Sequence, residues 1–308
     1  MTGLGVAALT FLVFSLAPSD GFLGWDDKAN LVANEAWRGF SLAHLKWMLT
    51  THHYGPWQPL SWFSWAVDHA LWGLDPQAFR RTNILLHAVA AGMFTECAFK
   101  LLKSKWGAVM AGVFFALHPL RVESVVWITE RRDVLSGAFF AGALLAYLKQ
   151  KRAWSLALFS AALLSKGTAV GLAWIILALE KDKKKSWPYF ALALGAGLMN
   201  LSAVGSEVNP VTMTLAQRHV VTLNSLGFYV VKTALPVNLS PYYPLSFNLS
   251  PFILALPLVP WRYGVVYALM LAPMSGLLQN GAQSYADRYS YLACLPFALL
   301  VGKYATPL

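Results

Sequence analysis

Charged residues are scarce in this sequence, at 12% of 308 residues. A soluble domain carries roughly twice that fraction, so the composition excludes an ordinary soluble enzyme, and its apolar character excludes a disordered chain. Cysteine is nearly absent as well. Cys97 and Cys294 both lie in apolar stretches without the spacing of metal ligands. This excludes a disulfide-stapled secreted module, and we expect both thiols to be buried packing residues.

Apolar residues, in contrast, make up 57% of the chain, and aromatic residues 14%. A membrane-spanning helix needs about 20 mostly apolar residues, and Trp and Tyr favour the headgroup region. The sequence therefore predicts an all-α fold, a polytopic transmembrane helix bundle of about 9–11 spans, forming a single domain over residues 1–308. Several apolar runs are short, so some spans should be half-helices. No basic segment precedes the run 2–18, which favours a retained first span over a signal peptide.

Basic residues gather after every second apolar run, in the segments 100–105, 149–152 and 181–185. The positive-inside rule makes these loops cytoplasmic. The acidic segment 19–58 should then be an external loop, in which Ser41 is a suitable N-cap for a short helix that lies in the membrane interface or packs as an ordinary loop. We therefore predict an integral multi-pass protein of the cell (inner) membrane with its functional site on the extracytoplasmic, or periplasmic, face.

The external loop carries two adjacent carboxylates, Asp26 and Asp27, just past the end of the first apolar run. A carboxylate near a low-dielectric interface has a raised pKa, which suits a general base. A solvated loop pair would have the same sequence, so the spacing leaves both interpretations open. Asp68 and His87 lie inside apolar runs, and we expect them to pair or pack rather than act.

The segment 118–133 interleaves acids and arginines after a proline. We expect a helix here that puts Glu123 and Glu130 on one face, because they are two helical turns apart. Arg131 and Arg132 suit bidentate phosphate binding. Salt bridges within the segment would explain these charges equally well.

Two later sites place charge at the ends of apolar runs. Lys166 stands alone between two such runs, so its charge must meet an anion or extend to the interface. Asp287, Arg288 and Tyr289 lie at the mouth of the last apolar run. A structural Asp–Arg pair would also account for them. Together these positions give an external face with carboxylates in the first loop and cations in later loops.

At these residues the chain resembles a known family. The run Gly24-Trp25-Asp26-Asp27, the stretch HPLRVESVVWITERRDVLSG at 118–137 and the stretch ADRYSYL at 286–292 are similar to those of the bacterial relatives of the transmembrane O-mannosyltransferases. These belong to the GT-C class of polytopic glycosyltransferases. The resemblance runs over almost the whole chain and covers the membrane part only, without the tetratricopeptide repeats that often follow it in relatives.

The resemblance implies an inverting glycosyltransferase that moves a monosaccharide from a polyprenyl-phosphate carrier to an acceptor hydroxyl on the extracytoplasmic side. Mannose is the favoured sugar. The acceptor would be a protein, a glycan or a lipid, and no nucleic acid takes part. An acidic residue of the first external loop serves as the base in such enzymes, which carries over to Asp26 or Asp27. The donor phosphate would be bound by cations, with further residues supporting the site. The cations are Arg131, Arg132, Lys166 and Arg288, and the supporting residues are His118, Glu123, Asp287 and Tyr289.

Two other classes of function remain to be weighed against this one. A transporter or flippase of lipid-linked sugars would show inverted repeats and charges near the bilayer midplane, whereas these charges cluster at the ends of apolar runs. A non-catalytic membrane scaffold would have lost the external carboxylates. No cofactor follows from the sequence, and two carboxylates serve with or without a divalent metal such as Mg²⁺ or Mn²⁺.

Overall fold

The computed structural model describes residues 2–18, 21–201, 213–277 and 283–306. Within these ranges the expected all-α fold is confirmed. The α-helices are α1 (Thr2–Phe14), α2 (Leu42–Thr50), α3 (Pro59–Trp72), α4 (Pro76–Leu102), α5 (Lys105–Leu117), α6 (Val122–Val126), α7 (Arg131–Leu148), α8 (Arg152–Ser165), α9 (Gly171–Leu179), α10 (Trp187–Leu201), α11 (Leu215–Ala234), α12 (Trp261–Leu271), α13 (Ser290–Ala293) and α14 (Leu295–Tyr304).

Short turns of other helix types link many of these helices. One π-helical turn, η1 (Lys28–Val32), lies in the first loop. The 3₁₀ segments are η2 (Pro119–Arg121), η3 (Ile128–Glu130), η4 (Gly167–Val170), η5 (Lys183–Ser186), η6 (Pro251–Leu258), η7 (Ala272–Met274) and η8 (Asp287–Tyr289). The strands that the structure describes are β1 (Tyr243–Pro244) and β2 (Gln283–Tyr285), which pair antiparallel.

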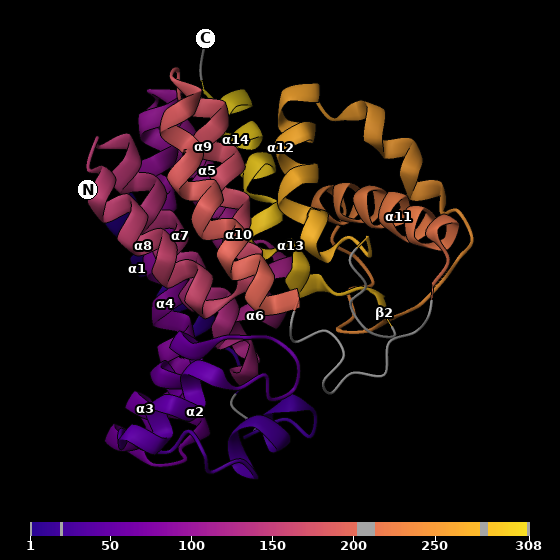
Figure 1. Ribbon diagram of the computed structural model, residues 1–308. Helices are drawn as coiled ribbons and strands as arrows, with labels where there is room; N and C mark the ends of the chain where they lie inside the picture. The colour runs from indigo at the N-terminus through magenta and orange to yellow at the C-terminus, as the bar shows by residue number, and fades with distance from the viewer. Residues whose placement is uncertain (1, 19–20, 202–212, 278–282, 307–308) are drawn as a thin grey trace.

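The long helix α4 organises the bundle. Its start is well defined, because the Asp75 side chain accepts a hydrogen bond from the Gln77 amide at 2.9 Å and Pro76 occupies the first turn. It ends at Lys103, whose φ of 58° is left-handed. Helices α1, α5 and α7 pack on α4, while α8 packs on α7 and α14 on α5. Figure 1 shows these helices side by side, with α11 and α12 on the other flank.

A second, smaller core lies under the first long loop, which joins α1 to α2. Trp37, Trp62, Trp65 and Phe79 are fully buried there and pack around Leu31. This core joins the loop to α2, α3 and the start of α4, below the main bundle in Figure 1. Of the loop expected over 19–58, residues 19 and 20 lie outside the described residues.

Other expectations about packing are also confirmed. The Ser41 side chain accepts a hydrogen bond from the His44 amide at 3.4 Å and caps α2, as predicted. Cys97 and Cys294 are buried free thiols. His87 is fully buried between helices, where its ring nitrogens contact the Tyr291 hydroxyl at 2.8 Å and the Ala116 carbonyl at 2.9 Å.

The number of membrane spans is not established by the structure. Among the described helices, α4, with 27 residues, is long and apolar enough to cross a membrane. Helix α5 and the segment Pro119–Val126 qualify only together, as one span bent by 53°. Helices of 10–14 residues rise about 15–21 Å, less than the roughly 30 Å of a hydrocarbon core. The expectation of about 9–11 spans therefore exceeds the one or two that these helices support by length and composition.

The charged segments lie at opposite ends of the helices. The basic segment 149–152 joins α7 to α8 at one end of this pair. Glu130 immediately precedes α7 and Lys166 immediately follows α8 at the other end. The candidate residues before α7 and after α8 therefore share one end of the bundle, and the lysine-rich turn lies at the other.

Close packing of α5 on α14 depends on two glycines that face each other. A Cβ atom added to Gly302 would lie 2.3 Å from the Gly107 carbonyl oxygen, and one added to Gly107 would lie 2.6 Å from the Gly302 carbonyl oxygen. Neither backbone can yield without separating the helices. The pair thus fixes how closely α14 approaches the bundle.

We expect Gly302→Leu to lower the free energy of unfolding by about 1–3 kcal/mol or more, because the added side chain overpacks this contact. Thermal unfolding in detergent measures the effect. Gly195→Leu is the matched control, because a Cβ atom at Gly195 meets no atom within 4 Å. Equal stability of the two variants would contradict the packing described here.

Candidate functional site

The segment 118–133 folds as separate short turns, so the single helix expected here is wrong. The break lies at Trp127, whose backbone is extended with ψ of 120° between α6 and η3. The Trp127 carbonyl accepts a hydrogen bond from the Asn83 side-chain amide at 3.2 Å, which holds the break in place. Glu123 and Glu130 nevertheless reach the same guanidinium, that of Arg288.

Glu130 is the centre of a buried charge cluster, formed by Glu123, Glu130, Arg132, Asp133, Lys166 and Arg288. Its carboxylate is fully buried and contacts three cations: Arg132 Nη2 at 2.5 Å, Lys166 Nζ at 3.2 Å and Arg288 Nε at 3.4 Å. Burial alone raises the pKa of Glu130, but these cations hold the pKa well below its usual value. Glu130 is therefore ionised at neutral pH.

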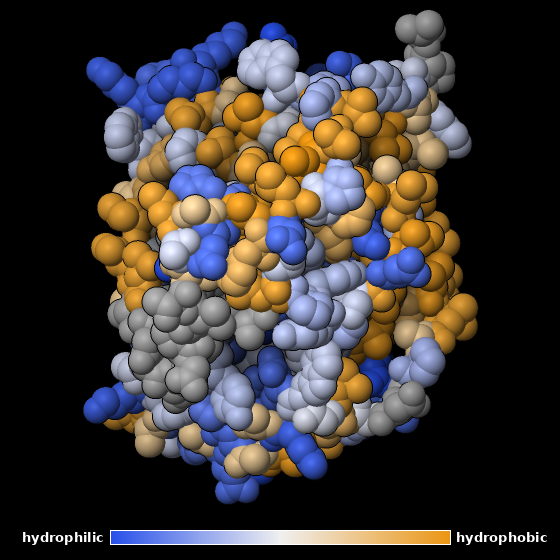
Figure 2. Space-filling model, turned by 90° about the vertical axis from the view of Figure 1, so that its right-hand side faces the viewer, coloured by the Kyte–Doolittle hydropathy of each residue, from blue (hydrophilic) through white to orange (hydrophobic). Residues whose placement is uncertain are grey.

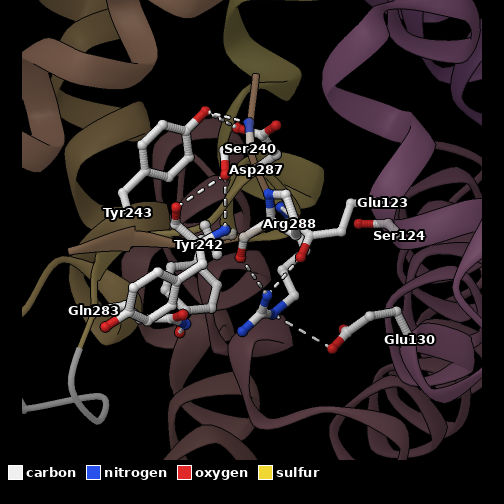
Figure 3. Close-up of polar contacts among 12 residues, drawn as sticks. Glu123, Ser124, Glu130, Ser240, Tyr242, Tyr243, Gln283, Asp287 and Arg288 are labelled. Carbon is white, nitrogen blue, oxygen red and sulfur yellow. Dashed lines mark hydrogen bonds and ion pairs between the residues drawn. The ribbon is translucent and has the colours of Figure 1, made fainter. Parts of the chain in front are cut away.

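The outer carboxylates of the charge cluster complete the pairing. Glu123 accepts hydrogen bonds from the Arg288 amide at 2.7 Å and from Arg288 Nη1 at 2.5 Å. Lys166 Nζ donates to Asp133 Oδ1 at 2.7 Å. Three acidic side chains thus pair with three basic ones in a largely buried site. Figure 3 shows the Arg288 guanidinium between Glu123 and Glu130.

Two guanidinium nitrogens of the charge cluster are left over from this pairing. The contacts with described residues use Nε and Nη2 of Arg132, and Nε and Nη1 of Arg288. Arg132 Nη1 and Arg288 Nη2 make none of these contacts, and the two side chains remain 12% and 11% exposed. Both groups contact the same oxygen of Glu130, so the unused N–H donors belong to neighbouring cations.

The structure gives the two loop carboxylates different surroundings. Asp27 is fully buried, and it accepts hydrogen bonds from the Thr129 amide at 2.9 Å, the Thr129 hydroxyl at 2.5 Å and the Leu23 amide at 2.9 Å. Burial raises the pKa of Asp27, and these hydrogen bonds partly offset it. Asp26 is only partly buried and accepts no hydrogen bond from the described residues, although it lies within electrostatic range of Arg132.

A cavity of about 600 Å³ opens beside the charge cluster. This volume is within the range of roughly 300–1,000 Å³ that ligand pockets occupy. Most of its wall is apolar, with two carboxylates among the residues that line it. The lining residues are Leu23, Gly24, Trp25, Pro119, Val122, Glu123, Val126, Trp127, Leu239, Ser240, Pro241 and Asp287. The wall therefore joins the loop before Asp26 to the Glu123 partner of Arg288.

Asp287 lines this cavity from η8, and Tyr289 lies in the same turn but not in the cavity wall. The Tyr243 hydroxyl donates to Asp287 Oδ1 at 3.0 Å and accepts from the Ser240 amide at 2.7 Å, so Asp287 anchors the loop that forms one cavity wall. Figure 3 shows this link between Tyr243, Ser240 and Asp287. Tyr289 accepts a hydrogen bond from the Gln283 side chain at 2.6 Å, and its ring lies 5.1 Å from the Arg288 guanidinium carbon.

Arg131 does not join the charge cluster. Its guanidinium is fully buried and turned toward α3, where Nη2 contacts Asp68 Oδ2 at 2.6 Å and the Phe79 carbonyl at 2.7 Å, and Nη1 donates to Ser64 Oγ at 3.0 Å. These partners leave it no access to the cavity, so its role is to fasten α7 to the second core. Asp68 is paired, as expected.

His118 also has a structural position. Its Nδ1 accepts a hydrogen bond from the Leu120 amide at 3.3 Å and caps η2, while Nε2 contacts the Thr233 carbonyl at 3.0 Å. Sequence reasoning missed Arg121, which is 2% exposed and donates to Ser290 Oγ at 2.5 Å. The only signal was a basic residue inside the segment 118–133. Arg121 holds the start of α13 against η2, and η8 with Asp287 and Arg288 directly precedes this point.

Whether the site uses a divalent metal stays a prediction from the sequence. In the part of the chain that the structure describes, no three His, Cys, Asp or Glu side chains come together as a metal site. The acidic groups of the charge cluster are occupied by cations. Mg²⁺ and Mn²⁺ remain predictions to be tested by chelation.

Comparison with known proteins gives partial matches to named enzymes. Protein O-mannosyl-transferase TMTC2 of Mus musculus and of Homo sapiens are each 40% identical over 92 residues, which is 30% of this chain and 11% of the relative. Protein O-mannosyl-transferase Tmtc1 of Drosophila melanogaster is 31% identical over 181 residues, 54% of this chain and 21% of the relative. The chain thus spans between about a tenth and a fifth of these relatives. No family model and no solved structure matches it.

We expect Glu130→Gln to lower the free energy of unfolding by about 3–5 kcal/mol, because it leaves three buried cations without their shared counter-charge. Denaturant unfolding of the purified protein measures this. Glu35→Gln is the control: Glu35 is 81% exposed and, among the described residues, pairs only with Arg38 at 3.1 Å, so the change should stay within about 0.5 kcal/mol. An unchanged free energy of unfolding in Glu130→Gln would show that Glu130 does not stabilise the fold.

A second prediction concerns Asp287. Burial raises the pKa of its carboxyl group to about 6. The folded state then takes up a proton as pH falls through about 6, whereas the unfolded chain does so only near 3.8. Stability relative to Asp287→Asn should therefore rise as pH falls across this window, by up to about 3 kcal/mol. Unfolding free energies of both proteins between pH 7 and pH 4.5, where about 2 kcal/mol of this change falls, test the prediction, and a difference that does not change with pH would refute it.

Proposed function

We propose that this chain is an inverting glycosyltransferase that transfers mannose from a polyprenyl-phosphate carrier to an acceptor hydroxyl. The observation that carries the proposal is the pair of unused guanidinium donors on Arg132 and Arg288, held on one carboxylate beside a 600 Å³ cavity. The partial similarity to proteins named protein O-mannosyl-transferase supports the sugar and the reaction. These names also favour a protein hydroxyl as the acceptor.

The phosphate of the donor would bind to Arg132 and Arg288. Guanidinium groups bind phosphate oxygens through charge-assisted hydrogen bonds, and a buried site strengthens such contacts. Lys166 would contribute through Glu130, since its own ammonium already contacts Glu130 and Asp133. Because these cations are fixed before the substrate arrives, they would stabilise the charge that develops on the leaving phosphate.

Asp26 would be the group that accepts the proton of the acceptor hydroxyl. In the step we propose, the acceptor oxygen forms a bond to the anomeric carbon while the bond from that carbon to the phosphate oxygen breaks. The electron pair leaves with the polyprenyl phosphate, and the hydroxyl proton passes to the Asp26 carboxylate. One carboxylate suffices for a single displacement, which inverts the anomeric configuration. Asp26 qualifies over Asp27 because its oxygens are not occupied by the described residues.

Asp27 would act as a positioning residue. Two of its accepted hydrogen bonds, from the Thr129 amide and hydroxyl, fasten the loop 21–27 to η3, next to Glu130, and the third, from the Leu23 amide, closes the loop on itself. Asp26 follows this anchor by one residue and lies within electrostatic range of Arg132. The anchor therefore keeps the proposed base beside the proposed phosphate site.

The membrane orientation that we propose follows from the two polar ends of the molecule. Figure 2 shows apolar residues over much of the upper part and the flanks of one face, interrupted by hydrophilic residues near its middle, with further hydrophilic residues at the upper edge and at the bottom. The lysine-rich turns at one end fit a cytoplasmic surface by the positive-inside rule. The charge cluster at the opposite end would then face the extracytoplasmic, or periplasmic, side of a multi-pass protein.

We expect Asp26→Asn to reduce sugar release from polyprenyl-phosphate-mannose at least a hundredfold without changing the unfolding temperature, because it removes the base and no packing contact. Asp27→Asn should instead lower the unfolding temperature, since one accepted hydrogen bond meets an amide donor. Asp182→Asn is the control: Asp182 is exposed and caps η5 by accepting from the Lys184 amide, which asparagine does equally well.

The release is measured with radiolabelled polyprenyl-phosphate-mannose, with and without EDTA, which tests for a required divalent metal. Full activity of Asp26→Asn would show that Asp26 is not the base. Scrambling of the labelled lipid across vesicles without any release of sugar would favour a flippase instead.

A further inference from the structure

We propose that Trp25 and Trp127 form a sugar-binding platform in this cavity, on which one face of the donor's pyranose ring packs. The identity of the sugar rests on the proposed function. The platform itself rests on the geometry of the cavity wall. It adds a binding subsite and a positioning residue, Trp25, to the phosphate site.

The two indole rings meet in the cavity wall in a defined geometry. Their centroids are 5.7 Å apart and their planes are inclined at 73°, an edge-to-face contact. Trp127 is 5% exposed, whereas Trp25 is 50% exposed. A large aromatic surface is thus supported from behind and open toward the cavity. Covering such a surface is favourable, because an indole has much apolar area to remove from water.

Trp127 is fixed by contacts on several sides. The guanidinium carbon of Arg288 lies 5.3 Å from the centre of the Trp127 ring, and the Trp127 carbonyl accepts from Asn83 at 3.2 Å. The same Arg288 holds one of the unused donors of the phosphate site. A ring that packs on the platform would therefore lie next to a phosphate bound at Arg288, as the two parts of a sugar phosphate require.

The polar groups of the cavity suit the rim of a sugar. A pyranose has an apolar face of C–H groups and a rim of hydroxyl groups, so it needs an aromatic surface and hydrogen-bond acceptors together. Glu123 and Asp287 line the same cavity as the two indoles. A carboxylate accepts about four hydrogen bonds, and each of these makes fewer with the described residues, so both have capacity for sugar hydroxyls.

The platform also adjoins the proposed base, because Trp25 immediately precedes Asp26. An exposed tryptophan near a membrane has another plausible use, as an interfacial anchor. The two roles make different demands on the side chain. A membrane anchor needs only an apolar side chain and does not affect sugar binding. A platform needs a flat aromatic ring that contacts the sugar.

Saturation-transfer NMR with mannose 1-phosphate, on the purified protein in detergent, tests the contact directly. We expect saturation of the aromatic protons to pass mainly to the hydrogens on C3 and C5, which share one face of mannopyranose. Trp25→Leu should abolish this pattern and Trp25→Phe should retain it in part. Trp154→Leu is the matched control, because Trp154 is 67% exposed at the far end of α8 from Lys166.

Kinetics with polyprenyl-phosphate-mannose give the second readout. Trp25→Leu should raise KM for the donor about tenfold, with a smaller change in kcat, and Trp25→Phe should recover most of the loss. If wild type releases no sugar, the proposed function fails, and the NMR pattern alone decides the platform. No saturation transfer from the wild-type protein to mannose 1-phosphate, or equal behaviour of Trp25→Leu and Trp154→Leu in both assays, would overturn the platform without contradicting the transferase.

Discussion

The arrangement of the site depends on the carboxylate of Glu130, which holds three cations from separate parts of the chain. Arg132 lies in the first turn of α7, Lys166 immediately follows α8 and Arg288 lies in η8. Their mutual repulsion in a buried site would be large without a shared counter-charge. Removing a charge from such a cluster is costly, whereas the intact cluster need not add much stability over an apolar core. The cost of keeping it is consistent with a functional role, namely to hold cations ready for an anion.

The fold delivers these groups to one place through broken helices. A continuous helix over 118–133 would have directed Glu123 and Glu130 along one line. The extended backbone at Trp127 instead leaves room for the loop 21–27, which Thr129 binds through Asp27. The same break presents the Trp127 ring to both Arg288 and Trp25. Local irregularity here serves to bring the first loop, the charge cluster and the cavity together.

The helices could be predicted from apolar periodicity and capping residues, and most of the apolar runs read from the sequence are helical. The number of spans could not, because apolar composition counts residues and does not tell a full span from a half-helix. For the site, sequence reasoning found Arg132, Lys166 and Arg288, but not their meeting on Glu130. The charge cluster joins residues as far apart as Glu123 and Arg288, separated by 165 positions.

Adjacent residues of like charge show most clearly what cannot be predicted from the sequence. Arg131 and Arg132 are indistinguishable by residue type, yet successive helical residues point about 100° apart, and Asp68 of α3 takes the first of them. Asp26 and Asp27 are separated in the same way by Thr129. In both pairs the deciding partner comes from a distant segment, so tertiary structure assigns the roles.

The most direct test of this account is the affinity for polyprenyl phosphate without its sugar, measured by native mass spectrometry. Arg132→Gln leaves Glu130 with Lys166 and Arg288, so the fold should persist. Loss of a charge-assisted contact worth about 1.5–3 kcal/mol would weaken binding roughly tenfold to a hundredfold. The same change at the exposed Arg81 should have no effect. Equal affinity of Arg132→Gln and wild type would contradict a phosphate site built on the charge cluster.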